Sequence, residues 1–164
     1  MIVMKRASFD FSDEPSTMKL LLQRVTSARV EVDDQNVGEI DRGMLVFVGV
    51  EKTDTSETVP AAVARLLKFR LFADEAGKMN GSLNDTANHL LLVPQFTLAA
   101  DTRKGNRPGF SVAARPDVAE GLFDEMAEQL LSILGPGRFA TGQFGADMAV
   151  HLTNDGPVTF LLDL

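Results

Sequence analysis

The chain has 164 residues, a formal net charge of −7 and no cysteine. This length suits one compact domain that buries its core without disulfides or metal, and the missing cysteines exclude disulfides, thiol catalysis and thiolate metal sites. No apolar run reaches the ~18–20 residues of a membrane-spanning helix, and the acidic balance argues against a globally basic nucleic-acid-binding surface. A chain without cysteine also fits a reducing compartment, so we expect a cytoplasmic location and no membrane association.

Residues 1–17 differ from the rest of the chain. They have mixed charge, few large apolar residues and no clear period. A secretory signal would need a continuous apolar segment, which is missing here. We therefore expect residues 1–17 to be a disordered extension and residues 18–164 to form the domain, with Met18 as a plausible start.

The N-terminal half of the domain predicts mainly β-structure. Val30 and Val32 alternate with charged residues, and Asp33–Asn36 has the composition of a hairpin turn. Met44–Val50 is almost continuously apolar, which is typical of a strand buried on both faces. The expected elements are strands at 19–25, 28–32, 37–40, 44–50 and 69–72, and a helix to about Lys68 whose N-cap candidates lie within 53–57. Pro60 is tolerable only in the first turn of this helix.

The C-terminal half predicts one deeply apolar strand at His89–Val93 and one long helix. The helix begins at Pro116, has an apolar face with a period of 3.6 residues, and ends at Leu134 before Gly135-Pro136-Gly137. Strands at 147–153 and 158–162 are expected to form a hairpin-like pair through Asn154-Asp155-Gly156-Pro157. The whole pattern predicts a single α/β domain in which two main helices pack on a mixed sheet.

The side chains available for catalysis are few. The only histidines, His89 and His151, lie far apart in sequence, and neither has a second ligand at metal spacing. Strand alternation places His151 on the face opposite Met148, Val150 and Leu152, so we interpret both histidines as structural or surface residues. We therefore expect neither a metal site nor a cofactor, and no Ser-His-Asp triad.

Four segments carry a resemblance that covers residues 18–164. They are Pro94-Gln95-Phe96-Thr97-Leu98, Lys104-Gly105-Asn106-Arg107-Pro108-Gly109-Phe110, Phe144-Gly145-Ala146-Asp147-Met148 and Asn154-Asp155-Gly156-Pro157-Val158-Thr159. In this order they resemble the signature segments of the D-aminoacyl-tRNA deacylases, the D-tyrosyl-tRNA(Tyr) deacylase family. The resemblance implies a barrel-like sheet with two helices, a homodimer, and hydrolysis of the ester bond of tRNA charged with a D-amino acid.

The resemblance assigns Gln95, Phe96 and Thr97 to the catalytic site. Thr97 is the tempting nucleophile, but the sequence offers no base to activate its hydroxyl. The aminoacyl ester is already activated, however, and the terminal ribose carries a hydroxyl beside it. We therefore expect RNA-assisted catalysis, in which the backbone N–H groups of Phe96 and Thr97 stabilise the oxyanion; one such donor is worth roughly 3–4 kcal/mol elsewhere.

Gly156-Pro157 is the second assignment. Only about 5–6% of X-Pro bonds are cis in folded proteins, so the sequence alone favours trans. The resemblance instead implies a cis bond that enters the partner subunit's site and rejects L-amino acids by collision with their side chains. Glycine has no side chain to collide, so glycyl-tRNA should be cleaved as well.

The segment 101–115 has a local charge of +3 within an acidic chain. We expect Arg103, Lys104 and Arg107 to lie near phosphates at the 3′ end of the tRNA. Phe110, with Phe96 as the alternative, would stack on the terminal adenine, and the resemblance also places Met148 near the pocket.

Two features leave alternatives. Pro94 stands where the commonest family motif has serine, and a Pro-Gln start resembles an animal paralogue that removes L-alanine from tRNA(Thr); Phe96 and Val158, however, match the D-specific class. The other alternative is a nucleic-acid-binding module without hydrolytic activity, against which the acidic net charge counts.

Overall fold

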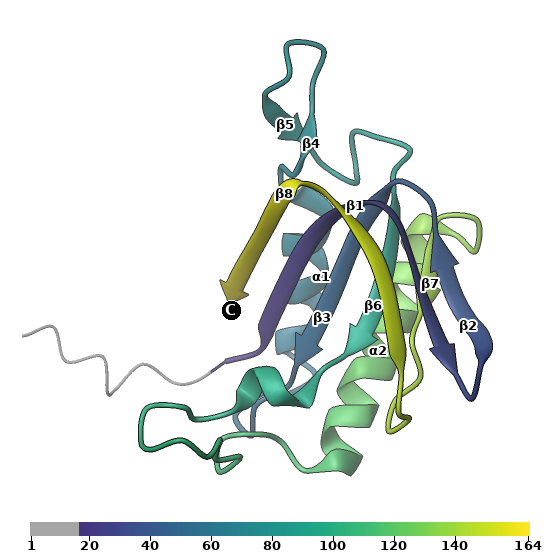
Figure 1. Ribbon diagram of the computed structural model, residues 1–164. Coiled ribbons are helices and arrows are strands. Elements are labelled where there is room, and N and C mark those ends of the chain that lie inside the picture. The colour runs from purple at the N-terminus through teal and green to yellow at the C-terminus, as the bar shows by residue number, and fades with distance from the viewer. Residues whose placement is uncertain (1–16) are drawn as a thin grey trace, which may run out of the picture.

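The computed structural model describes residues 17–164. The extension expected at residues 1–17 therefore lies, apart from Thr17, outside the described residues. The elements are β1 (Lys19–Val32), β2 (Gln35–Ile40), β3 (Gly43–Gly49), α1 (Thr58–Lys68), β4 (Phe72–Ala73), β5 (Met79–Gly81), β6 (His89–Pro94), the 3₁₀ helix η1 (Phe96–Ala99), α2 (Pro116–Leu134), β7 (Phe139–Thr141) and β8 (Ala149–Asp163). Figure 1 shows their arrangement.

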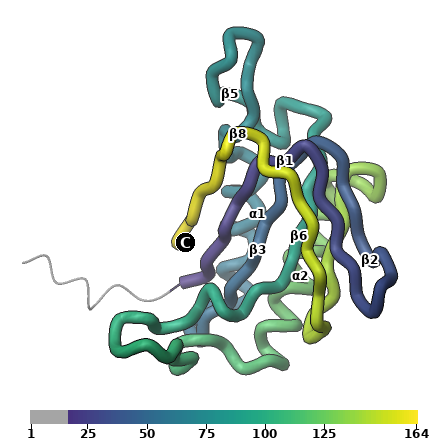
Figure 2. The backbone as a smooth tube through the Cα atoms, in the orientation of Figure 1, coloured from purple at the N-terminus to yellow at the C-terminus, as the bar shows by residue number. Residues whose placement is uncertain are grey.

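Six strands form one sheet that is nearly closed. Its path runs β2-β1-β3-β6-β7, and β8 pairs with β1 outside this path. The pairs β3–β6 and β6–β7 are parallel, whereas β1 is antiparallel to its three neighbours. The path's two ends meet, because a Cβ atom built on Gly38 of β2 would lie 2.3 Å from the carbonyl oxygen of Thr141 in β7. The tube in Figure 2 follows this curled sheet, which confirms the barrel-like α/β fold.

Both faces of the central strands are buried. Met44, Val46 and Val48 of β3 belong to the cluster that includes the apolar faces of α1 and α2. Leu45 belongs to a second cluster on the other face of the sheet, together with Val93 of β6. The helices thus cover one face while the curl of the sheet closes over the other. This arrangement confirms the expectation that both apolar runs are fully buried strands.

The two helices have the predicted positions. α2 begins at Pro116 and ends at Leu134, where Gly135 has a φ of +78°, a conformation that favours glycine. α1 begins at Thr58 with Glu57 at its N-cap, which is among the expected cap positions. Pro60 lies in the first turn, where a backbone N–H would have no partner within the helix, so its absence there breaks no helical hydrogen bond.

Several strand predictions were wrong. The expected hairpin at 147–162 is one strand, β8, and both of its halves pair with β1, so Asn154–Pro157 is an irregularity within the strand. Likewise, β1 is continuous where two strands were expected. The strand at 69–72 is reduced to Phe72–Ala73, and the short strands β5 and β7 were not predicted. Local pattern does not distinguish a turn from a bulge that a long partner strand spans.

Candidate functional site

Gln95 and the 3₁₀ helix η1 that follows it, together called the Gln95 turn, come directly after β6 and lie against the end of β3. The N–H of Gln95 donates to the carbonyl of Val48 at 2.7 Å, which extends the parallel β3–β6 ladder by one bond. The turn packs closely on Gly49, where a Cβ atom would come within 2.7 Å of the Leu98 Cβ. The absence of a side chain at Gly49 therefore allows η1 to sit directly on the end of β3.

The backbone donors at the start of η1 are the chemical feature of this turn. The first hydrogen bond of η1 runs from the N–H of Leu98 to the carbonyl of Gln95, at 3.2 Å. The N–H groups of Phe96 and Thr97 precede that bond and have no backbone acceptor outside η1 among residues 17–164. Both residues are exposed, so a ligand can approach these donors.

The hydroxyl of Thr97 is held by its neighbour. The side-chain amide of Gln95 donates a hydrogen bond to Thr97 Oγ1. No histidine or carboxylate in the described part of the chain hydrogen-bonds this hydroxyl. A neutral amide donor takes no proton from a hydroxyl, so the arrangement orients Thr97 without activating it.

Two of the predicted pocket residues lie beside this turn. The ring of Phe110 is 5.2 Å from the ring of Phe96, at an interplanar angle of 49°, and both side chains are exposed. Met148 lies near Pro94, because a Cβ atom on Gly142 would lie 2.9 Å from the Met148 sulfur and 3.5 Å from Pro94 Cδ. The structure thus places Phe110 beside Phe96 and Met148 near Pro94.

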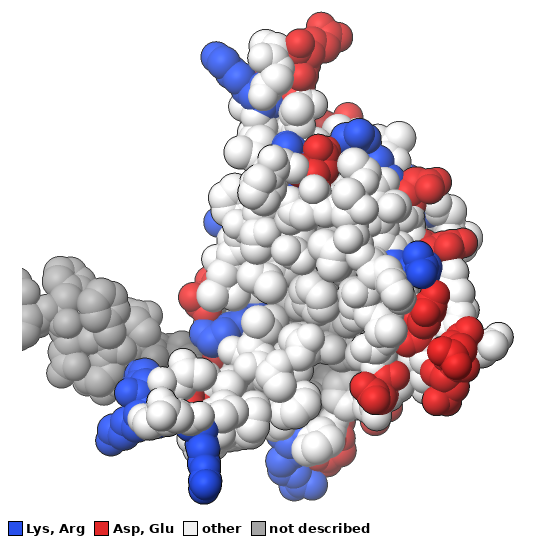
Figure 3. All heavy atoms as spheres, viewed as in Figure 1, with Lys and Arg blue, Asp and Glu red and all other residues white. Residues whose placement is uncertain are grey.

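The segment 101–115, called the basic loop below, lies next to the same turn. Its cations differ in whether they are already paired within the protein. Asp101 and Gly109 exchange two backbone hydrogen bonds, of 2.7 and 2.9 Å, which close the base of the loop. Arg103 binds both carboxylate oxygens of Asp101, each at 2.9 Å, and this guanidinium holds the pKa of Asp101 well below its usual range. Lys104 and Arg107 are exposed. Figure 3 shows basic side chains over this loop at the lower left and acidic ones at the right.

Gly156 and Pro157 lie in an enlarged bulge of β8, at the edge of the sheet. In the β1–β8 ladder, Thr159 pairs with Gln23 and Asn154 pairs with Val25. Arg24 alone therefore faces the four residues from 155 to 158. The Gly156-Pro157 bond is cis, and both residues are exposed.

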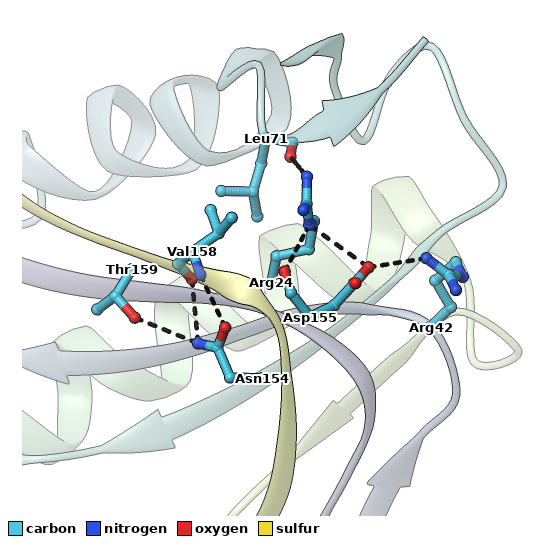
Figure 4. A network of polar contacts seen from close by, with 7 residues as sticks. All are labelled: Arg24, Arg42, Leu71, Asn154, Asp155, Val158 and Thr159. Carbon is cyan, nitrogen blue, oxygen red and sulfur yellow. Dashed lines mark hydrogen bonds and ion pairs between the residues drawn. The ribbon is translucent and has the colours of Figure 1, made fainter. Parts of the chain in front are cut away.

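Side chains on both sides hold this bulge in place, as the close-up in Figure 4 shows. Arg24 Nε donates to the carbonyl of Asp155 at 3.0 Å, and Arg24 Nη1 donates to the carbonyl of Leu71 at 3.1 Å. The carboxylate of Asp155 also pairs with Arg42, at 2.9 Å. Sequence reasoning did not identify Arg24 or Arg42, because no local motif links either arginine to Asp155, which lies 131 and 113 positions later.

The structure does not bring the two motifs together within one chain. Arg24, beside the bulge, is paired with Met44 of β3, whereas Gln95 is bonded to Val48. Four residues of a strand separate these levels, which is about 13 Å along the sheet. The bulge therefore projects at one end of the sheet and the Gln95 turn lies at the other.

The histidines lie away from this site. His151 is exposed, and its Nε2 is 3.1 Å from the carboxylate of Glu31; His89 opens β6, at the end opposite Pro94. A cavity of about 480 Å³ is lined by both histidines and by Arg29 and Glu39, and the Gln95 turn is not part of its lining. Residues 17–164 contain no group of three or more potential metal-ligating side chains, and none of their helices is long and apolar enough to cross a membrane.

Comparison with known proteins adds independent findings. The model of the family described as D-Tyr-tRNA(Tyr) deacylase matches residues 21–163. The D-aminoacyl-tRNA deacylase of Teredinibacter turnerae is 56% identical over 146 residues, which are 89% of this chain and 99% of that protein. The one from Ectopseudomonas mendocina is 55% identical over 147 residues, 90% and 100% of the two chains.

Two solved structures are similar over most of their length. A c-Myc DNA unwinding element binding protein superposes with a TM-score of 0.83 at 40% identity, covering 88% of this chain and 97% of that one. A probable eukaryotic D-amino acid tRNA deacylase superposes with a TM-score of 0.81 at 20% identity, covering 90% and 99%, which supports the fold.

Proposed function

This chain belongs to the D-Tyr-tRNA(Tyr) deacylase family, and we propose that its Gln95 turn is where it hydrolyses the ester bond of D-aminoacyl-tRNA. The observation that carries the enzyme class is the family match, which spans nearly the whole domain. The products are free tRNA and the D-amino acid. We place this activity in the cytoplasm, where aminoacyl-tRNA is used.

The proposed mechanism relies on backbone donors. The N–H groups of Phe96 and Thr97 would bind the ester carbonyl oxygen and the oxyanion that develops from it; their exposure and their position before the first hydrogen bond of η1 support this role. The ribose hydroxyl beside the ester would assist the attack of water, so that the RNA supplies the group that the protein lacks. The orientation of these partners contributes further, because a positioned reactant avoids much of the entropy cost.

Thr97 is assigned a positioning role and not a covalent one. Its oxygen accepts the hydrogen bond from the Gln95 side chain, and no base lies beside it among the described residues. A hydroxyl without a base is a weak nucleophile at neutral pH. The Gln95 and Thr97 side chains would instead fix the turn so that its N–H groups converge on the ester.

We assign the rejection of L-amino acids to Gly156-Pro157. The bulge is exposed, and Arg24 and Asn154 hold it in a defined position. Its carbonyl groups would face the α-carbon of the substrate, where an L side chain collides and a D side chain does not. Because glycine lacks the colliding group, glycyl-tRNA would also be cleaved.

A homodimer follows from this assignment. Within one chain the bulge and the Gln95 turn lie about 13 Å apart along the sheet, so a bulge that acts at the turn must come from a partner. Two features support self-association. β8 pairs with β1 alone in the described sheet, which leaves a long free edge, and the face over β1 and β8 in Figure 3 is largely uncharged.

The loop cations would bind the 3′ end of the tRNA. Lys104 and Arg107 are the better phosphate ligands, since the guanidinium of Arg103 is already engaged by Asp101. Phe110 and Phe96 form an exposed pair on which the terminal adenine can stack, and Met148 would border the same pocket.

A second candidate function is DNA binding without hydrolysis. The observation that favours it is the 40% identity to a structure whose title names a DNA unwinding element binding protein. The acidic net charge disfavours it, because non-specific DNA affinity comes from phosphate neutralisation.

One experiment separates these functions. Matched D-Tyr-, L-Tyr- and Gly-tRNA, together with L-alanyl-tRNA(Thr), are incubated with substoichiometric protein, and loss of each ester is followed while sedimentation reports the oligomeric state. We expect rapid loss of the D and glycyl esters by a dimer, with the L ester intact. Cleavage of L-alanyl-tRNA(Thr) would indicate the paralogue's specificity. A folded protein that cleaves none of the esters but binds duplex DNA would support the second candidate.

A further inference from the structure

Two carboxylates are buried where β3 leads into α1. Asp54 is 5% exposed and Glu51 is fully buried. The two oxygens of Asp54 accept backbone hydrogen bonds, one from the N–H of Met18 at 3.0 Å and the other from the N–H of Glu51 at 2.8 Å. Asp54 therefore ties the start of β1 to the segment that follows β3.

Glu51 has no such partners. Neither of its carboxylate oxygens accepts a hydrogen bond within the described part of the chain. Its nearest cation is Lys19, whose Nζ lies 3.4 Å away and is also bound to Asp163. Lys19 is thus the one lysine beside the three carboxylates of Glu51, Asp54 and Asp163. A buried charge without full compensation is costly. Burial raises the pKa of Glu51, despite the opposing charge of Lys19.

The group that Asp54 already binds is the main-chain nitrogen of Met18. In a chain that begins at Met18 this nitrogen would be an ammonium group, which has three donors and a positive charge. The relative from Ectopseudomonas mendocina aligns with 147 residues of this chain over its whole length, and the segment Met18–Leu164 has that length. The alignment therefore leaves 17 residues of this chain without a counterpart in that relative.

We propose that Asp54 and Glu51 form a binding site for an α-ammonium group, which the amino terminus of Met18 fills in a form of the protein that begins there. The ammonium keeps the existing bond to Asp54 and offers its two additional donors to Glu51. It also supplies the positive charge that the group of carboxylates lacks.

The site would stabilise the base of the basic loop and the strand end beneath the Gln95 turn. Glu51 forms a bridge with Ala113, and the N–H of Ala114 donates to the carbonyl of Val50, so the base of the basic loop rests on this segment. Gly49, on which the Gln95 turn packs, is paired with Lys19. An ordered terminus at Met18 therefore stabilises the strand ends beneath both loops. This inference concerns chain form and stability, and it stands apart from the proposed deacylation mechanism.

The test compares two chain forms, residues 1–164 and residues 18–164. The shorter form should fold, because every buried apolar residue of the described part lies at or after position 18.

Glu51→Gln removes the charge and keeps the shape, and Asp163→Asn is the control at the exposed partner of Lys19. Loss of a compensated charge pair should lower the Tm of the shorter form by about 2–4 °C for each kcal/mol lost. In the longer form Glu51→Gln should leave the Tm unchanged or raise it, whereas Asp163→Asn should act equally in both. Equal shifts from Glu51→Gln in the two forms would overturn the proposal.

A second measurement does not depend on any variant. The α-amino group of the shorter form should titrate at least one unit above its ordinary pKa of about 7.7–8.0 and be acylated at least about tenfold more slowly at pH 7 than the same group in a free peptide. Glu51→Gln, where it folds, should move this pKa downward. An α-amino group that reacts at the free-peptide rate would overturn the site, whatever the variants do.

Discussion

The side chain of Asn154 binds the backbone of Val158 through both ends of its amide. The N–H of Val158 donates to Asn154 Oδ1 at 2.7 Å, and Asn154 Nδ2 donates to the carbonyl of Val158 at 3.2 Å. These bonds join the two ends of the bulge that carries Gly156 and Pro157. Asn154 therefore fixes the position of the bulge, and its role does not require contact with the aminoacyl group of the substrate.

Replacing Asn154 with alanine should weaken discrimination between D- and L-esters. The change removes two hydrogen bonds worth about 0.5–1.5 kcal/mol each, so L-Tyr-tRNA cleavage should rise by roughly tenfold while D-Tyr-tRNA cleavage changes little. The ratio of the two single-turnover rates measures this effect. Asn36→Ala, in the remote strand β2, is the matched control. A lower Tm with unchanged discrimination would contradict the role assigned to the bulge.

Removing the hydroxyl of Thr97 should leave most of the activity. Thr97→Val keeps the shape and the backbone N–H, so kcat should fall by less than about tenfold, against the 10²–10³ that loss of an oxyanion donor costs elsewhere. Single-turnover deacylation of D-Tyr-tRNA checks this, with Thr26→Val at an exposed site of β1 as the control. Near-complete loss of activity would show that the hydroxyl takes part in the chemistry.

The three cations of the basic loop should contribute unequally to tRNA binding. Lys104→Ala and Arg107→Ala should each raise KM and reduce the slope of log K against log salt by about 0.7, the value for one single-strand phosphate contact. Arg103→Ala should have a smaller effect, because Asp101 already binds this guanidinium. Lys78→Ala, in the β4–β5 hairpin, is the control. An effect of Arg103→Ala as large as the other two would show that the ion pair opens on binding.

Glu51 should give the 164-residue chain a stability that falls with rising pH. Burial raises the pKa of Glu51, despite the opposing charge of Lys19, while Asp54 and Asp163 add repulsion. The folded state therefore holds this proton at a pH where the unfolded state has lost it. The contribution is fully present below the unfolded value of about 4.3 and is lost as the pH rises through the folded value. Burial also raises the pKa of Asp54, which contributes with the same sign. Unfolding by urea from pH 4 to 8 should therefore show this slope, and Glu51→Gln should reduce it. An identical slope in the variant would contradict the assignment.

Much of the fold could be read from particular patterns. α2 lies between Pro116 and Gly135 as expected, because a first-turn proline and a glycine with positive φ mark helix ends through backbone sterics alone. The apolar runs of β3 and β6 correctly indicated strands with two covered faces. β8 was misread because Asn154–Pro157 has the composition of a turn, and only the length of β1 makes it a bulge.

By itself the sequence determined the family, the two helices, the buried strands and the residues of the Gln95 turn. Short-range sterics, hydrophobic period and contiguous motifs depend only on residues that are close together in the sequence. Tertiary structure alone decided which distant groups meet. It placed Arg24 and Asn154 on the Gly156–Pro157 bulge, separated that bulge from Gln95 within one chain, and buried Glu51 beside Asp54 under the start of β1. These relations depend on strand register and on the closure of the sheet, which bring together residues whose separation along the chain carries no local signal.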